Sequence, residues 1–380
     1  MGVVSTFGCG VTPFWEAISS GRSGIRPIEG LAPLRFPNGA QVGGYIASEH
    51  FDEKRLMLLD RFAQYALVAA REAMRQAGAP AIDAVITGCS AGGQDAMDAG
   101  FVELYRNNSP RVNPLMVPRV MSSGAASHMA MEFDIEGPVY SVSTACSSAN
   151  HAIGQAFTMV RSGICKSALT GGCESVFSYG FLKAWEAMRV VSPDTCRPFS
   201  RNRRGLILGE GAGMLVIENY DIARARGAEI LAEIVGFGMS SDAHHITQPT
   251  ADGPARAMRA AIADANIQKV HYINAHGTGT LANDARETEA IRSIFSGNVL
   301  VSSTKSMHGH ALGAAGALEA VATVMALRKQ LLPPTANYTE KDPECAMDVI
   351  PNEPREAEIE YALSNSFAFG GLNAVLAFRR

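Results

Sequence analysis

The sequence predicts an α/β fold built from two similar halves. Strand-like and helix-like segments alternate along the 380 residues, and several of the strand-like segments run directly into glycine-rich loops. Alternation of this kind is typical of helices that cover a mainly parallel or mixed sheet. The strand-and-helix pattern then begins again near Gly227. We therefore expect a first half over residues 1–228 and a second half over residues 229–380.

The first half contains a clear helix and several expected strands. Residues 62–78 (FAQYALVAAREAMRQAG) carry apolar side chains at three- and four-residue steps and end on glycine, which predicts a helix. Residues 137–142 (GPVYSV) are short, apolar and β-branched and predict a buried strand, and residues 151–163 have the spacing of a helix. The remaining expected strands lie in residues 83–93, 166–175 and 211–227, the last of which leads into a helix.

The second half repeats this alternation. Residues 228–242 predict a strand and residues 253–267 a helix. Two further strands, in residues 270–280 and 298–307, each end in a polar loop rich in glycine, serine or threonine. Residues 359–380 predict two strands on either side of a glycine turn.

Composition and charge argue against two classes of function. The chain is 47% hydrophobic and 18% charged, which is ordinary for a globular protein with a large core. Its formal net charge of −4 offers no basic excess for binding nucleic acid. The most apolar window, residues 311–327, contains Glu319 and is shorter than the roughly 20 apolar residues that a membrane-spanning helix needs. We therefore expect a buried core helix there and no membrane span.

The cysteines and glycines predict neither a metal site nor a cofactor. The seven cysteines are odd in number and include no CxxC pair, which favours a reducing cytoplasm over a disulfide framework or a zinc site. The GEGAG run at residues 209–213 lacks the Lys-Ser/Thr of a phosphate-binding loop, and no helical pattern follows it directly. A tight loop before a buried strand is the better interpretation of this run.

Cys146 is the first candidate for chemistry. It lies where the strand-like residues 137–142 give way to a helix, and its neighbours on both sides are small. A helix N-terminus favours the thiolate form, and small neighbours leave room for a ligand beside the sulfur. A lone cysteine is more often a buried structural thiol, so this position alone does not decide between the two roles.

Two histidines and a lysine in the second half are candidate partners for this thiol. His276 and His310 each follow an apolar strand at the start of a polar loop, and Lys305 shortly precedes the second of them. Imidazole donors and an ammonium suit a reaction that builds negative charge on oxygen or carbon, whereas the spacing matches no standard zinc pattern. The NSFAFGGLNA segment, residues 365–374, adds a loop that can bend sharply while presenting aromatic rings.

Taken together, these motifs indicate a family. TACSSA, NAHGTGT, VSSTKSMHGHALGAAGALEA and NSFAFGG, in this order, resemble the β-ketoacyl-acyl-carrier-protein synthases of the thiolase superfamily. The resemblance is strongest to the elongating type II enzymes, which include rhizobial nodulation relatives and polyketide ketosynthases, and it covers nearly the whole chain. It implies a thiolase fold with five alternating layers, a homodimer, and a ping-pong decarboxylative Claisen condensation with malonyl-carrier protein.

The resemblance also implies roles for particular residues. Cys146 matches the nucleophile that receives the acyl chain from the carrier's phosphopantetheine. His276 and His310 match the pair that stabilises the carbanion left by decarboxylation, supported by Lys305 and by the buried carboxylate Glu319. The backbone amides of Cys146 and Phe369 should form the oxyanion hole, and the Phe369 ring should gate the acyl pocket. The hydroxyls matching those that hold the pantetheine arm are Thr278 and Thr280.

Two departures from the family pattern bear on substrate and carrier. Ala91 and Gln94 stand where aliphatic residues are commoner in the acyl-pocket loop, which predicts a pocket for long, unsaturated or otherwise unusual chains. The expected docking helix has Met57, Leu58 and Leu59 in the stretch where basic residues are commoner, so docking of an acidic carrier should be weaker, more hydrophobic or specific to a dedicated carrier. The basic residues expected to contact the carrier are Lys54, Arg55, Arg61 and Arg203.

Three other functions compete with this one. A non-catalytic chain-length-factor subunit would lack the nucleophilic cysteine, whereas this chain has Cys146 and both histidines. A coenzyme A thiolase needs a second cysteine near the C-terminus as a base, and the last one here, Cys345, lies outside the NSFAFGG loop. A cysteine hydrolase is compatible with the small-residue elbow but fits two donor histidines and a lysine poorly.

Overall fold

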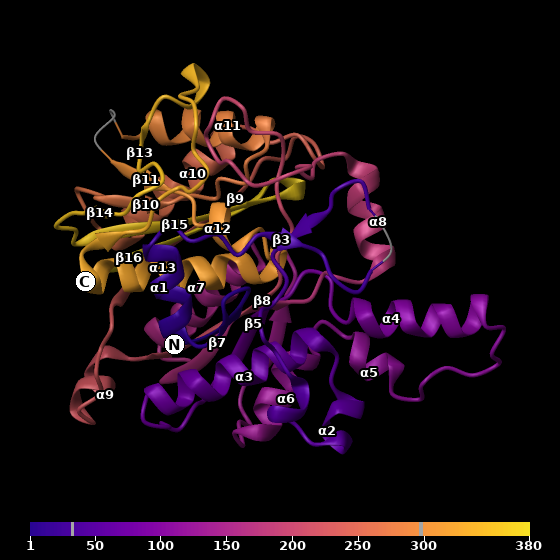
Figure 1. Cartoon of the computed structure of the whole chain (residues 1–380). Coiled ribbons are helices and arrows are strands. Elements are labelled where there is room, and N and C mark those ends of the chain that lie inside the picture. The colour runs from indigo at the N-terminus through magenta and orange to yellow at the C-terminus, as the bar shows by residue number, and fades with distance from the viewer. Residues whose placement is uncertain (32–33, 296–298) are drawn as a thin grey trace.

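Two mixed six-stranded sheets form the framework of the protein (Figure 1). The computed structural model describes residues 1–31, 34–295 and 299–380. The first sheet has the order β2 (Gly8–Cys9), β1 (Gly2–Ser5), β8 (Gly211–Glu218), β7 (Ser167–Glu174), β5 (Ala84–Gly88) and β6 (Val139–Val142). The second has the order β13 (Asp348–Val349), β11 (Leu300–Ser302), β10 (Tyr272–Asn274), β15 (Tyr361–Ala368), β16 (Leu372–Arg379) and β9 (Glu233–Ser241).

The two sheets have the same topology. In the first, β5 pairs in parallel with β6 and β7, and β7, β8 and β1 then pair antiparallel. In the second, β10 pairs in parallel with β11 and β15, and β15, β16 and β9 then pair antiparallel. Five strands of each sheet therefore correspond in order and direction, which confirms the expected two similar halves, and the sixth strands, β2 and β13, lie at opposite ends of their sheets.

Helices complete five alternating layers. The central layer contains α7 (Ser148–Arg161) and α13 (Ala315–Lys329), whose apolar side chains pack against both sheets. The outer face of the first sheet is covered by α3 (Arg61–Gln76) and α6 (Gly124–Glu132). The outer face of the second is covered by α10 (Asp252–Ala265) and α11 (Leu281–Arg292), as Figure 1 shows. The window at 311–327 is thus a buried core helix, as expected.

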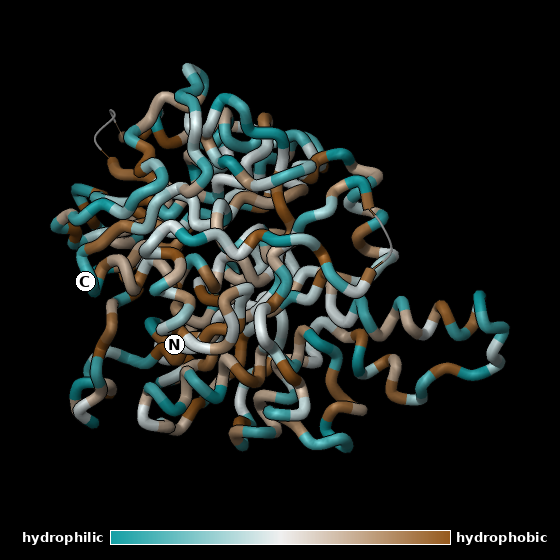
Figure 2. Tube along the Cα trace, in the orientation of Figure 1, coloured by the Kyte–Doolittle hydropathy of each residue, from teal (hydrophilic) through white to brown (hydrophobic). Residues whose placement is uncertain are grey.

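Shorter elements decorate this framework. The remaining α-helices are α1 (Val11–Ser19), α2 (Glu53–Leu58), α4 (Gln94–Phe101), α5 (Met116–Val120), α8 (Tyr179–Met188), α9 (Tyr220–Ala225) and α12 (Lys305–His308). The remaining strands form two short pairs, β3 (Arg26–Pro27) with β4 (Asn38–Gly39) and β12 (Leu331–Leu332) with β14 (Arg355–Glu356). The segment carrying α4 and α5 projects from the body as an arm, along which Figure 2 shows hydrophobic patches.

Two expected strands differ from their prediction. The strand at 137–142 is β6, in which only Val142 is buried and the other three residues are half-buried. β6 lies at the edge of its sheet, so it does not receive the burial that its β-branched composition suggests. The strand expected from residue 298 is β11, which begins at Leu300, and Asn298 itself lies outside the described residues.

Candidate active site

Cys146 lies in a sharp elbow between the first sheet and the central layer. β6 ends at Val142, α7 begins at Ser148, and Ala145 adopts a positive φ of 49° between them. A left-handed conformation is costly for a residue with a side chain, and such strain is often found at functional sites. The elbow is held by backbone hydrogen bonds from the N–H of Ser147 to Thr144 O (3.2 Å) and from that of Ser148 to Ala145 O (3.2 Å).

Burial governs the protonation of this thiol. Cys146 is only 7% exposed, and burial raises its pKa to about 12. The positive charge of Lys305 and hydrogen bonds from the backbone N–H groups of Cys146 and Phe369 act in the opposite direction and are outweighed. Burial therefore opposes the thiolate character that the helix start favours, because a buried anion loses its hydration.

His276 and His310 follow two neighbouring strands of the second sheet. His276 comes two residues after the end of β10, and His310 lies between β11 and α13. Their rings meet edge to face with centroids 5.3 Å apart, and the ring of Phe367 lies 6.0 Å from that of His276. His310 occupies the place in the second half that Cys146 occupies in the first: His310 lies between β11 and the central helix α13, and Cys146 between β6 and the central helix α7. The shared topology thus brings the thiol and the imidazoles together.

Both imidazoles are neutral in this environment. Burial lowers the pKa of His276 and of His310 well below the usual value, and the nearby Lys305 lowers them further. Lys305 is itself fully buried and forms an ion pair with Glu319 of α13, the only carboxylate among the described residues that pairs with it. Burial raises the pKa of Glu319 and Lys305 opposes that rise. The Lys305–Glu319 contact expected from the sequence is therefore present.

Cys146, His276 and His310 line one small cavity. Its volume is about 110 Å³, and Thr278, Thr280, Trp185 and Phe369 are also among the residues in its wall. The hydroxyl oxygens of Thr278 and Thr280 lie 2.9 Å apart, and Thr280 also caps α11 by accepting a hydrogen bond from the N–H of Asn283. The structure therefore places a thiol, two neutral imidazoles and two hydroxyls around one space.

Phe369 contributes both its backbone and its ring to this site. It begins the tight turn between β15 and β16, where Gly370 and Gly371 have φ angles of 81° and 69°. Its backbone N–H helps to lower the pKa of the Cys146 thiol, and its ring stacks on that of Trp185 with centroids 6.1 Å apart and planes 22° apart. Sequence reasoning did not identify Trp185, because nothing in the sequence of α8 relates it to residue 369.

Sequence reasoning also missed three buried carboxylates that hold the loops of the site. Glu287 accepts hydrogen bonds from the N–H of His276 (2.8 Å) and of Gly277 (2.7 Å). Asp284 accepts one from the N–H of Gly279 (3.2 Å). Glu174 accepts hydrogen bonds from the N–H of Ala91 (3.1 Å) and of Gly313 (3.0 Å). The spacing of residues 284 and 287 in the first turns of a helix after a glycine loop was an available signal, since both reach back toward the loop.

Ala91 and Gln94, both described by the structure, are not among the residues that line the 110 Å³ cavity. The N–H of Ala91 is bound by Glu174, and the side-chain amide of Gln94 donates to Ala91 O at 2.7 Å. Their contact with an acyl chain therefore stays a prediction.

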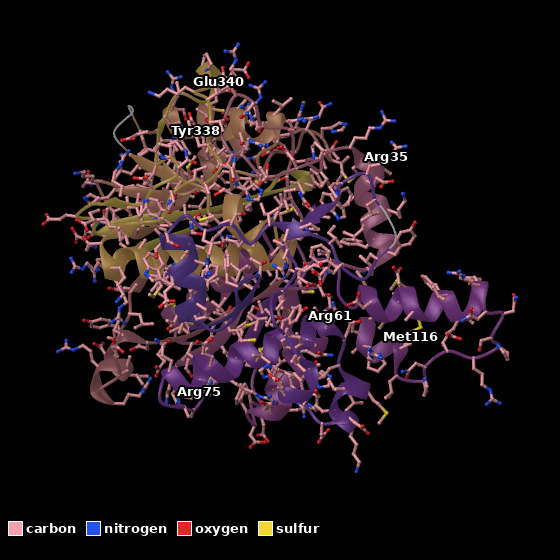
Figure 3. All side chains as sticks on the ribbon, viewed as in Figure 1. Arg35, Arg61, Arg75, Met116, Tyr338 and Glu340 are labelled. Atoms are coloured by element: carbon pink, nitrogen blue, oxygen red, sulfur yellow. The ribbon has the colours of Figure 1, made fainter. Side chains whose placement is uncertain are left out.

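The four expected docking residues fall into two groups. Lys54 is exposed on α2, Arg55 pairs with Glu132 at 3.2 Å, and Arg61 pairs with Asp95 at 3.6 Å while its side chain stays 47% exposed. Figure 3 shows Arg61 near the base of the arm that carries Met116. Arg203 is the exception, and its prediction is wrong. Its side chain is 0% exposed, because it forms ion pairs with Asp342 and, at 3.9 Å, with Asp284.

Other classes of site are not found in the part of the chain that the structure describes. Within those residues, no group of three or more His, Cys, Asp or Glu side chains is arranged to hold a metal ion. No described helix is both long enough and apolar enough to cross a membrane. The seven cysteines, all of them described, are free thiols.

Comparison with known proteins gives one family. The β-ketoacyl synthase N-terminal domain matches residues 1–223, and the C-terminal domain of that family matches residues 231–339. The chain is 48% identical over 393 residues to a nodulation protein E of Rhizobium sp. (strain N33), covering 100% of this chain and 98% of that protein. It is 38% identical over 400 residues to a 3-oxoacyl-[acyl-carrier-protein] synthase 2 of Staphylococcus aureus (strain N315), covering 100% and 97%.

Solved structures agree with these relatives. The ishigamide ketosynthase/chain length factor superposes with a TM-score of 0.95 at 35% identity, covering 100% of this chain and 97% of that one. A type II PKS ketosynthase, in complex with its acyl-carrier protein and bound to the hexaketide, superposes with a TM-score of 0.90 at 31% identity and the same coverage. The five-layered fold is therefore the thiolase-like fold of the ketosynthases, and the chain belongs to the β-ketoacyl synthase family.

Proposed function

We propose a role for each of three residues in the elongating condensation that this acyltransferase of the β-ketoacyl synthase family catalyses. Cys146 carries the acyl chain, and His276 and His310 stabilise the carbanion that extends it. One observation carries the proposal. The thiol and the two imidazoles line the same 110 Å³ cavity, whose wall also includes Phe369. Covalent catalysis of this kind divides one difficult step into two easier ones.

In the first half-reaction the Cys146 sulfur attacks the carbonyl carbon of an acyl thioester. The carbonyl oxygen becomes an oxyanion, which the N–H groups of Cys146 and Phe369 stabilise. The intermediate then expels the phosphopantetheine sulfur, which leaves as a thiol because it receives the proton that Cys146 gives up. An acyl-cysteine and a free carrier thiol result, and the number of thioester bonds is unchanged.

In the second half-reaction a malonyl thioester loses carbon dioxide. The bond between the carboxylate carbon and C2 breaks, and its electron pair moves into the thioester as an enolate. Neutral His276 and His310 can donate hydrogen bonds to that enolate oxygen, which is why their lowered pKa values suit the task. C2 then attacks the acyl-cysteine, a carbon–carbon bond forms, and the Cys146 sulfur leaves and takes up a proton.

We propose an acyl carrier protein as the donor of both thioesters. Thr278 and Thr280 are placed to bind the amides of its pantetheine arm, and Lys54, Arg55 and Arg61 offer positive charge for docking. α2 also exposes apolar side chains beside these charges, with Met57 55% and Leu58 38% exposed. The carrier should therefore meet a mixed surface, in which apolar contact replaces part of the usual charge attraction.

A homodimer is the assembly that the surface favours. β6 is an edge strand whose residues are mostly half-buried, so its free edge can pair with a second copy. The nearby arm exposes apolar side chains, among them Val117 at 69% and Tyr105 at 77%. Exposed apolar surface of this extent is typical of a protein interface.

Two further proposals concern domain organisation and location. We place the boundary between the halves at residues 228 and 229, because β8 and α9 finish the first repeat by Ala225 and β9 begins the second at Glu233. We place the protein in the cytoplasm, because its seven cysteines are free thiols and six of them are buried.

The test is incubation with acyl-carrier and malonyl-carrier thioesters, following carbon dioxide and the 3-oxoacyl product by mass spectrometry. The Cys146→Ser variant should lose acyl transfer, and His310→Ala should keep acyl transfer but lose condensation. Wild-type rates of acyl transfer by the serine variant would overturn the assignment of Cys146.

A further inference from the structure

The cavity beside Cys146 is too small for the acyl chains that an elongating synthase carries. It has a volume of about 110 Å³. A cavity measured in this way needs about 10–15 Å³ for each group of the size of a water molecule or a methylene. The space next to the sulfur is therefore too small for a sixteen-carbon chain, which can enter only if part of the wall moves.

Phe369 is the part of the wall best able to move. Its ring is half-buried, whereas Cys146, His276, His310 and Lys305 are all buried. The two glycines that follow it both have positive φ angles, so the turn can change conformation without the steric cost that other residues meet. Ala368 before it is only partly buried as well.

The Phe369 ring must separate from Trp185 when it moves. Its indole lies 6.1 Å from the Phe369 ring at an interplanar angle of 22°, and on another side it meets Phe181 edge to face at 6.4 Å. Trp185 is only 8% exposed and belongs to the same apolar cluster as Cys146. The long connection between β7 and β8 supplies this tryptophan, and the short turn after β15 supplies the phenylalanine.

We infer that Trp185 is a specificity-determining residue: its stacking holds the Phe369 ring over the acyl pocket and so disfavours long chains until they displace the ring. This inference rests on the proposed role of Cys146 as the acyl carrier. An aromatic pair of this kind contributes enough to change an equilibrium about two- to tenfold. Loss of the stack should therefore raise acylation by long chains by that factor and leave short chains, which fit the closed cavity, unchanged.

The first experiment compares Trp185→Leu with the wild type. Acylation of Cys146 is followed by rapid quench and intact-protein mass, with acyl-pantetheine thioesters of four and sixteen carbons as donors. The ratio of the sixteen- to the four-carbon rate should rise about two- to tenfold. Trp185→Phe, which keeps a ring, should return the ratio toward the wild-type value. Trp15→Phe, at the other tryptophan in a separate core cluster, should leave it unchanged. An unchanged ratio in Trp185→Leu would overturn the inference.

A second measurement keeps the inference testable if Trp185→Leu does not fold. The chain has two tryptophans, so Trp15→Phe leaves Trp185 as the only one. Acylation with the sixteen-carbon donor should change the Trp185 fluorescence, and the four-carbon donor should not. A sixteen-carbon acyl-Cys146 seen by mass with unchanged fluorescence would refute the role of Trp185 and leave the proposed function standing. If neither donor acylates Cys146, both the proposed function and the role of Trp185 are overturned.

Discussion

Replacing Lys305 by methionine removes a buried cation on which both stability and chemistry depend. Lys305 and Glu319 are each 0% exposed and form an ion pair. The same lysine lowers the pKa of His276 and of His310. Methionine has a similar length and fills the space without charge, so the variant should show two effects that can be separated by a second substitution.

The effect on stability follows from the carboxylate that is left behind. Breaking a buried ion pair by removing one partner costs about 3–5 kcal/mol. The entropy of unfolding is about 2.1 cal/mol/K per residue, so for 380 residues this cost lowers the Tm by about 4–6 °C. Without Lys305 the pKa of Glu319 rises further. A raised folded-state pKa stabilises at low pH, where the carboxyl is protonated, so the loss should grow as the pH rises from 6 to 9.

The effect on chemistry has the opposite pH dependence. Without the cation, the pKa values of His276 and His310 rise, and a larger share of the imidazoles is protonated at acidic pH. The acid side of the pH–rate profile for malonyl decarboxylation should therefore move to higher pH. Thermal melting at pH 6, 7.5 and 9, together with that profile, measures both effects.

The Lys305→Met/Glu319→Leu double variant separates them. It removes both charges of this buried pair, so most of the lost stability should return. The pH–rate profile should keep its shift, because the histidines still lack the lysine. A double variant that regains the wild-type profile would show that Lys305 acts only through Glu319. A single variant that melts like the wild type at all three pH values would refute the reasoning about the buried pair.

Three other predictions follow from the site. Because burial raises the pKa of Cys146 to about 12, its alkylation by iodoacetamide should accelerate steadily from pH 7 to 10, and a plateau near neutral pH would contradict this. Arg203→Met should lower the stability by about 3–5 kcal/mol in a melting assay and leave the KM for the carrier unchanged. Lys54→Glu should leave the stability unchanged and raise the KM for the carrier. Ala91→Phe should shorten the acyl chains accepted, and an unchanged chain-length profile would remove this residue from the pocket.

The sequence was sufficient to predict the fold because each half carries complete local signals. The helix at 61–76 and the core helix at 315–329 have apolar patterns that no other structure satisfies as well. The burial of β6 was not predictable, because its place at the sheet edge depends on strand order. The composition of a strand shows which side chains could be buried, but its position in the sheet determines how many of them are buried.

The residues that line the cavity were predictable from local motifs. The ion pairs between residues far apart in the sequence were not. Cys146, His276 and His310 stand together as expected. Arg203 was misplaced because its partner Asp342 lies 139 residues away along the chain, and no local pattern joins them. The burial of Cys146 was not predictable for a similar reason: the helix start is visible in the sequence, whereas the extent of burial is a property of the assembled layers.

The connections that supply Trp185 and Phe369 differ between the two halves. Cys146 and His310 come from equivalent connections, the first between β6 and α7 and the second between β11 and α13, so both lie in a part of the fold that the two halves share. The next connections are unequal: residues 175–210 join β7 to β8 and include α8, whereas three residues join β15 to β16. Trp185 and Phe369, which stack on each other beside the thiol, come from these two unequal connections. Substitutions at Trp185 should therefore change the accepted chain length more than decarboxylation, because Trp185 stacks on Phe369, whereas the rings that contact His276 are those of His310 and Phe367.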